Sequence, residues 1–86
     1  MNEYITAAIG AASGLTDPER ALLLADAVDA VADHDGLSRE AAAELLDRAA
    51  ATGDARLVGD VEQVAVYVHG QAVVAISRAE LRELAG

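Results

Sequence analysis

The chain has 86 residues, of which 15 are acidic and 6 are basic, and its formal net charge is -9. Hydrophobic residues make up 53% of it, which is too much for a disordered chain, and its length allows one small domain, over residues 1–86, with a marginal core. The absence of cysteine and lysine excludes disulfides, thiolate metal sites, cysteine nucleophiles and catalysis by a lysine amine.

The first predicted elements are helices. Thr16 is expected to cap the second of them, because a proline follows in the first turn and Glu19 stands three residues after the cap. Ser38 is expected to cap the third, and Gly53 suits the left-handed position that follows a helix. With a shorter amphipathic segment ahead of them, these signals predict three helices, over residues 2–13, 17–33 and 38–52.

The second helix is expected to pack one face in the core and to carry acidic side chains on the other. The predicted core face consists of Leu24, Val28 and Val31 with Ala21, Ala25 and Ala32. The predicted acidic stripe consists of Glu19, Asp26, Asp29 and Asp33. A solvated surface explains this stripe, and a recognition surface for a partner is the alternative. Leu22 projects into the stripe and Leu23 lies at its margin, so both leucines are candidates for partner binding.

After the third helix, β-branched residues predict strands. Two apolar runs on either side of His69 predict a β-hairpin over residues 61–76, in which Tyr67 and His69 are further candidates for partner binding. The short extended stretch 56–58 can pair with the hairpin as a third strand.

The last predicted element is a helix over residues 78–85, because Ser77 and Glu80 have the spacing of a helix cap. The expected fold class is therefore α+β, with three N-terminal helices, a β-hairpin and a short C-terminal helix.

This order of elements resembles the winged-helix architecture, with residues 38–52 in the place of the recognition helix and His69 near the wing tip. Recognition helices of that family present basic or amide side chains to DNA. Here the candidates for nucleic-acid contact, Arg39 and Arg48, stand among acidic residues. The resemblance implies a DNA-binding regulator of transcription or, as for many winged helices, a protein that contacts other proteins.

The turn between the second and third helices resembles a degenerate calcium loop of the EF-hand type, with Asp33, Asp35 and Glu40 as candidate oxygen ligands. Val31 and Ala42 occupy the positions at which that loop has its first Asp and its bidentate Glu. The helix-Asp-Gly-helix pattern also resembles the repeats of TerB-like domains. An ordinary interhelical turn explains the same residues, so we expect no metal and no cofactor.

The remaining polar residues do not form a recognisable catalytic motif. The two histidines, His34 and His69, lie about half the chain apart in sequence, and surface positions explain both. The serines stand where helix caps explain them, and a small alanine-rich domain has little volume for a pocket that displaces the pKa of a carboxyl. We therefore expect no enzymatic activity.

The composition resembles that of proteins from salt-in halophilic archaea, since arginine replaces lysine, alanine and valine are abundant, and the isoelectric point is about 4.3. GC-rich actinobacteria and their phages are the alternative source. At ~1 M salt the electrostatic screening length falls to ~3 Å, so the negative charge of a halophilic protein would not forbid contact with DNA.

The sequence favours a small, acidic, non-enzymatic interaction module that forms a homodimer or docks on a protein partner in a regulatory role. A marginal core and a hairpin with a free edge support this interpretation. The expected partner-binding residues are Leu22, Leu23, Asp26, Asp29, Tyr67 and His69. The alternatives are a DNA-binding regulator from a halophile and an acidic, viral mimic of nucleic acid. No signal peptide or membrane helix is predicted, so a cytoplasmic protein is expected.

Overall fold

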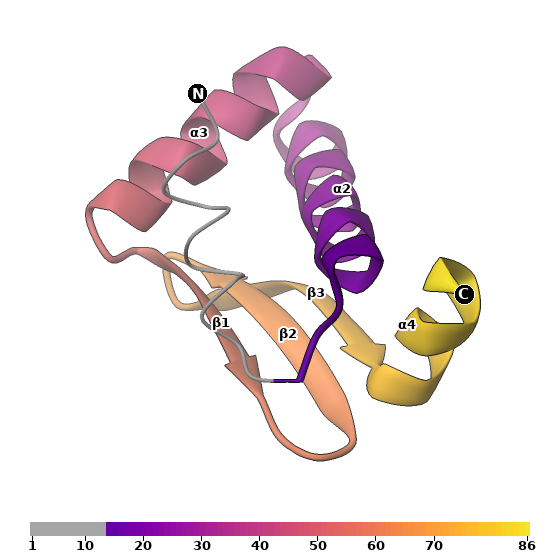
Figure 1. Cartoon of the computed structure of the whole chain (residues 1–86). Helices are drawn as coiled ribbons and strands as arrows, with labels where there is room; N and C mark the ends of the chain where they lie inside the picture. Colours follow the sequence, from indigo (N-terminus) through magenta and orange to yellow (C-terminus); the bar gives the residue numbers. More distant parts are fainter. Residues whose placement is uncertain (1–13) are drawn as a thin grey trace.

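A computed structural model describes residues 14–86 of the chain. The elements are α2 (Asp17–Asp35), α3 (Arg39–Ala51), β1 (Ala55–Gly59), β2 (Gln63–Val68), β3 (Gln71–Ser77) and α4 (Arg78–Ala85). The predicted α+β class is confirmed, and the order within the described residues is two helices, three strands and one helix (Figure 1). The predicted helix over residues 2–13 lies outside the described part of the chain.

The start of α2 is the capping box that the sequence predicts. The Thr16 hydroxyl accepts a hydrogen bond from the Glu19 N–H at 3.3 Å, and the Glu19 carboxylate accepts one from the Thr16 N–H at 2.9 Å. Glu19 is only 6% exposed, so its predicted place in a solvated acidic stripe is wrong. The helix ends two residues later than predicted, at Asp35, because Gly36 takes the left-handed conformation with φ of 65°. Serine caps begin the other two described helices, since Ser38 and Ser77 accept hydrogen bonds from Ala41 and Glu80 N–H groups.

The predicted core face of α2 is wrong in part. Leu23 and Ala27 are completely buried, whereas Leu24 is half-buried and Ala21 is exposed. The helix contacts α3, α4 and β3 together, so the neighbours turn a different arc of its surface inward than the helical wheel suggested. Leu23 therefore belongs to the core and is not available for a partner, and the half-buried Leu22 packs against that core.

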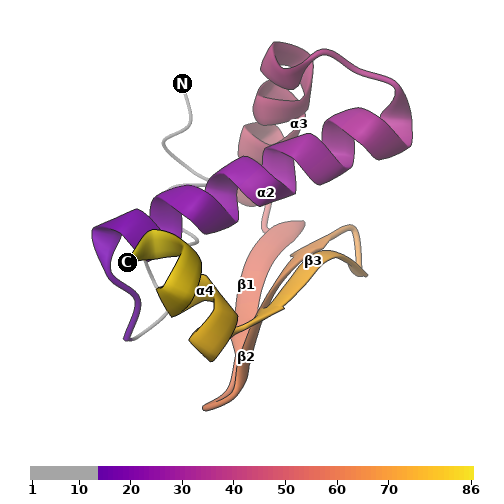
Figure 2. The ribbon, with the colours of Figure 1, turned by 90° about the vertical axis from the view of Figure 1, so that its right-hand side faces the viewer.

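The three strands form one antiparallel sheet in the order β1-β2-β3. The predicted hairpin is present, and the predicted third strand is β1, which pairs with β2 through contacts such as Leu57 opposite Val66. The register of β2 and β3 shifts between Val66 and Tyr67. Two views show the helices on one side of the sheet (Figures 1 and 2). The alternation of buried and exposed residues along β2 agrees, because every second side chain is buried.

Aliphatic side chains from both layers build the core between helices and sheet. The largest completely buried residues are Leu23, Leu46, Leu81, Val64 and Val66. The chain has no phenylalanine or tryptophan, so close packing of small and medium side chains takes the place of large aromatic anchors.

Arg78, the first residue of α4, joins three parts of the chain. Its Nε donates to the Asp60 backbone oxygen at 2.6 Å, and its backbone N–H donates to the Glu62 oxygen at 2.8 Å. Its guanidinium lies against Gly59, where a Cβ would be only 3.3 Å away, and against Gly14. We call this set of contacts the Arg78 clasp. It ties the β1–β2 turn to the start of α4.

Candidate partner-binding groove

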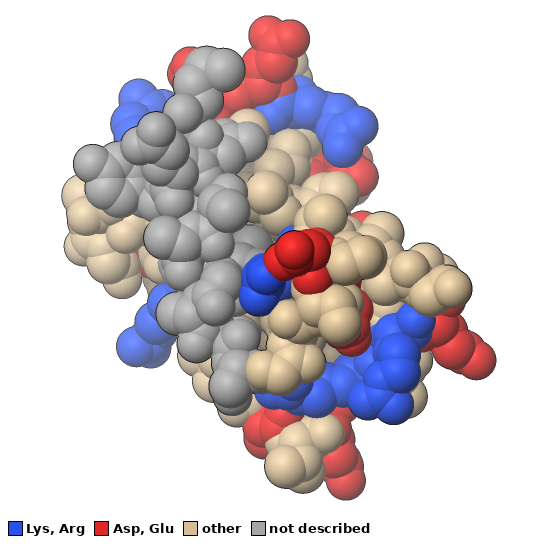
Figure 3. All heavy atoms as spheres, viewed as in Figure 1, with Lys and Arg blue, Asp and Glu red and all other residues tan. Residues whose placement is uncertain are grey.

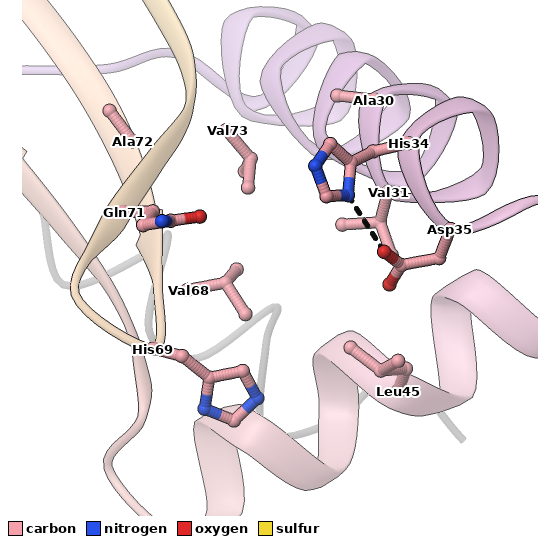
Figure 4. A pocket seen from close by; sticks show the side chains of 10 residues that line it. All are labelled: Ala30, Val31, His34, Asp35, Leu45, Val68, His69, Gln71, Ala72 and Val73. Carbon is pink, nitrogen blue, oxygen red and sulfur yellow. Dashed lines mark hydrogen bonds and ion pairs between the residues drawn. The ribbon is translucent and has the colours of Figure 1, made fainter.

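A cavity of about 460 Å³ lies between the C-terminal end of α2, the middle of α3 and the β2–β3 hairpin (Figure 4). Its apolar lining consists of Ala30, Val31, Leu45, Val68, Ala72 and Val73. Its polar lining consists of His34, Asp35, His69 and Gln71. An apolar lining with a few polar groups is typical of ligand-binding pockets, and the volume lies in their usual range.

Both histidines of the protein line this cavity, although they are far apart in sequence. His34 comes from the last turn of α2, and its Nδ1 lies 2.7 Å from the Asp35 Oδ1 (Figure 4). The two imidazoles are accessible, with 82% of the His34 side chain and 64% of the His69 side chain exposed. No spacing in the sequence indicates that both rings line one cavity, since only the tertiary fold brings the hairpin tip near the end of α2.

His69 stands at the tip of the hairpin in an uncommon backbone conformation. Its φ is 51°, and it is the only described residue other than glycine with a positive φ. Tight hairpin turns of this kind favour Asn, Asp and Gly at such a position. Asp54 holds the residue in place, because its backbone oxygen accepts the His69 N–H at 2.8 Å and its Oδ2 lies 3.8 Å from the His69 Nδ1. The Thr52 hydroxyl donates to the same Oδ2 at 3.1 Å.

A second, shallower hollow of about 240 Å³ adjoins the first. It shares Leu45 and His69 with the larger cavity and extends along the end of α3 to Arg48, Ala49 and Thr52. Because the two hollows share these lining residues, we treat them as one depression and call it the groove.

The other predicted partner-binding residues lie on separate surfaces. Asp26 and Asp29 are exposed on α2. Tyr67 is half-buried and alternates with the buried Val66 and Val68, which places its side chain on the face of the sheet away from the core. His69 is the one predicted partner-binding residue that lines the groove.

The two arginines considered for nucleic-acid contact are in different surroundings. The Arg39 Nε forms an ion pair with the Asp29 Oδ1 at 2.9 Å, whereas Arg48 lines the shallow end of the groove. A different group of cations, which sequence reasoning missed, lies near the start of α2 and on α4. There Arg20 forms an ion pair with Asp17, and the charges of Arg82 and Arg78 help to lower the pKa of Glu19. Figure 3 shows arginine and carboxylate side chains next to one another on the visible face.

Among residues 14–86, two carboxyl groups have a lowered pKa, and both lie outside the groove. The pKa of Glu19 is lowered chiefly by hydrogen bonds from the Thr16 backbone N–H and hydroxyl, with help from the charges of Arg82 and Arg78. The pKa of Asp60 is lowered chiefly by the Gln63 and Glu62 N–H groups, each of which donates to its Oδ1 at 2.8 Å. Both shifts therefore come from a helix cap and a turn.

The candidate calcium ligands do not form a metal centre within the described residues. Asp35 contacts His34, and residues 14–86 contain no group of three or more histidine, cysteine, aspartate or glutamate side chains that could hold a metal ion. Within the same part of the chain, none of the helices has the length and apolar character needed to span a membrane.

Comparisons with known proteins place the chain beside one solved structure. No family model and no curated protein matches the sequence. The crystal structure of a bacterial toxin from Mycobacterium tuberculosis is similar to this chain with a TM-score of 0.78 and 34% sequence identity. The similarity covers 85% of this chain and 99% of the mycobacterial chain. The protein therefore belongs to the same family as this mycobacterial toxin.

Proposed function

We propose that this protein is a toxin that acts by docking on a protein partner and that it catalyses no reaction. The observation that carries this proposal is the extent of the match to the mycobacterial toxin. Since 99% of that chain is covered, the similarity extends over essentially the whole of its crystallised chain and not over an accessory part.

The chemistry of the groove supports docking rather than catalysis. Most of its lining is apolar, which favours burial of a partner's side chain. The two described carboxyls with a lowered pKa, Glu19 and Asp60, form a helix cap and a turn outside the groove, which accounts for both shifts without a catalytic role. A small domain with an apolar groove can still act strongly on a cell by blocking the surface of another protein.

Induced expression in a mycobacterial host tests the toxin part of the proposal. We expect colony counts to fall after induction of the intact gene. A matched gene with a stop codon in place of the Glu19 codon should leave the counts unchanged. Equal growth of the two strains, with the intact protein detected in the cells, would contradict a toxin function.

Three assays with the purified protein test the alternatives to docking. Total RNA and plasmid DNA should stay intact during incubation, and cleavage that disappears in a His34→Asn or His69→Asn variant would overturn the absence of catalysis. Duplex DNA should not bind from low to molar salt. Binding that weakens as salt rises would instead favour the winged-helix-like regulator, because phosphate contacts release counterions. Displacement of a nucleic acid from its own binding protein would favour the acidic mimic.

A further inference from the structure

We infer that the groove binds a basic peptide segment of a partner protein, with one apolar side chain of that segment seated between α2 and the hairpin. The inference rests on the proposed docking function and identifies where the partner binds and what chemistry it presents. Shape, charge and hydrogen-bonding capacity each contribute to it.

The shape of the groove favours a peptide. The larger hollow is deep enough to have a floor of core residues, with Val31 and Val68 buried at its base. The second hollow continues from it past Leu45 and His69, so a ligand that fills the first can extend over the second. An extended peptide with one anchoring side chain has this form, and such anchors supply much of the binding energy of an interface.

The charges at the mouth favour a basic ligand. Each histidine of the groove has a carboxylate beside it, Asp35 next to His34 and Asp54 next to His69. The chain as a whole carries a formal charge of -9, so its field attracts cations and repels anionic segments. An arginine beside the apolar anchor would meet the carboxylate of Asp35, which lines the larger hollow, or that of Asp54 next to His69, and planar guanidinium groups fit carboxylates well. Arg48 lines the second hollow and would repel a cation there, so the basic residues of the ligand belong next to the anchor.

The histidines add acceptors for a peptide. In both rings it is Nδ1 that faces the carboxylate, at 2.7 Å in His34 and 3.8 Å in His69. An imidazole whose Nδ1 donates to its carboxylate has a lone pair on Nε2, which can accept an N–H of a peptide backbone or of an arginine side chain. His69 lines both hollows, so its ring is within reach of a ligand in either one.

The test uses a short probe, acetyl-Ser-Arg-Trp-Arg-Ser amide, with the chain of 86 residues. The chain contains no tryptophan, so indole fluorescence reports only on the peptide. We expect a saturable blue shift of the indole emission as the anchor leaves water. In the first control peptide glycine replaces the tryptophan, and binding is followed through a fluorescent label. In the second control peptide glutamate replaces both arginines. Both should bind at least about tenfold more weakly, which corresponds to about 1.4 kcal/mol.

Three variants place the binding in the groove. Ala30→Leu adds side-chain volume to the larger hollow on a helix that tolerates leucine, and we expect about tenfold weaker binding of the probe. Ala21→Leu makes the same change at an exposed position of the same helix that does not line the groove, and binding should be unchanged. Asparagine tolerates a positive φ, so a loss of binding in His69→Asn would reflect the lost imidazole and not misfolding.

Each outcome decides between the proposals. Equal binding by Ala30→Leu and the unaltered protein, with both folded by circular dichroism, would overturn the groove as the site. Equal binding of the glutamate peptide would overturn its preference for basic segments. A dimer in sedimentation that Ala30→Leu converts to a monomer would make a second copy the occupant and contradict the inference. If induction still stops growth while no probe binds, the inference fails and the toxin function stands.

Discussion

The helices and the sheet of this protein divide its charge unequally. The described carboxylates lie on helices and turns, and the three strands carry a single charged side chain, Arg56. Both layers pack one face against the same aliphatic core. The acidic side chains on the outward faces of the helices would repel a second acidic molecule. The negative charge therefore lies on the helices and the turns, and the strands contribute none of it.

The largest expected effect tests whether the two layers share one core. Leu46→Ala removes a completely buried side chain of α3 that packs in the core with strand residues, and it should cost about 2–5 kcal/mol in the free energy of unfolding, measured by urea denaturation. Leu84→Ala is the matched control on α4, because 62% of Leu84 is exposed and its removal should change stability by less than about 0.5 kcal/mol. Equal losses in the two variants would contradict a shared core.

A smaller effect is expected at the start of the helical layer. Thr16→Ala removes the side-chain cap of α2 and should lower the free energy of unfolding by about 1 kcal/mol, which lowers Tm by about 4–8 °C. Thr16→Ser keeps the hydroxyl and should stay close to the unaltered protein. A cap that contributes nothing would leave the three melting curves superimposed.

The dependence of stability on pH should distinguish Glu19 from the exposed acidic residues of the helices. The folded-state pKa of Glu19 lies below its ordinary value, so its ionised form stabilises the fold at neutral pH. This contribution is lost as the pH falls through the unfolded-state value of about 4.3 towards the folded-state pKa. Glu19→Gln should therefore be less stable than the unaltered protein at pH 7, with a smaller difference near pH 3, as followed by thermal melts. Asp26→Asn, at an exposed position of the same helix, is the control and should show no such convergence.

The smallest expected effect separates stability from binding at the hairpin tip. His69→Asn should leave the free energy of unfolding unchanged or raise it by up to about 0.5 kcal/mol, because asparagine accepts the observed φ of 51° more readily. The same variant should lose affinity for the probe peptide. A clear loss of stability would mean that the contact of the His69 ring with Asp54 holds the hairpin together.

Local sequence signals predicted where the described helices begin. Tertiary contacts decided which side chains are buried and which residues line the groove. Thr16, Ser38 and Ser77 cap their helices as expected, since a cap depends on residues three positions away. The helical wheel gave the period of α2 but not the direction of its buried arc, because α3, α4 and β3 set that direction together. His34 and His69 line one cavity because of how the hairpin packs, and no spacing in the sequence indicates this packing.

The Arg78 clasp and the groove lie at opposite ends of the sheet. The clasp ties the β1–β2 turn to the start of α4, while the groove opens at the opposite, hairpin end of β2. The length of β2, Gln63–Val68, therefore separates the contacts that fix α4 from the site at which a ligand would bind.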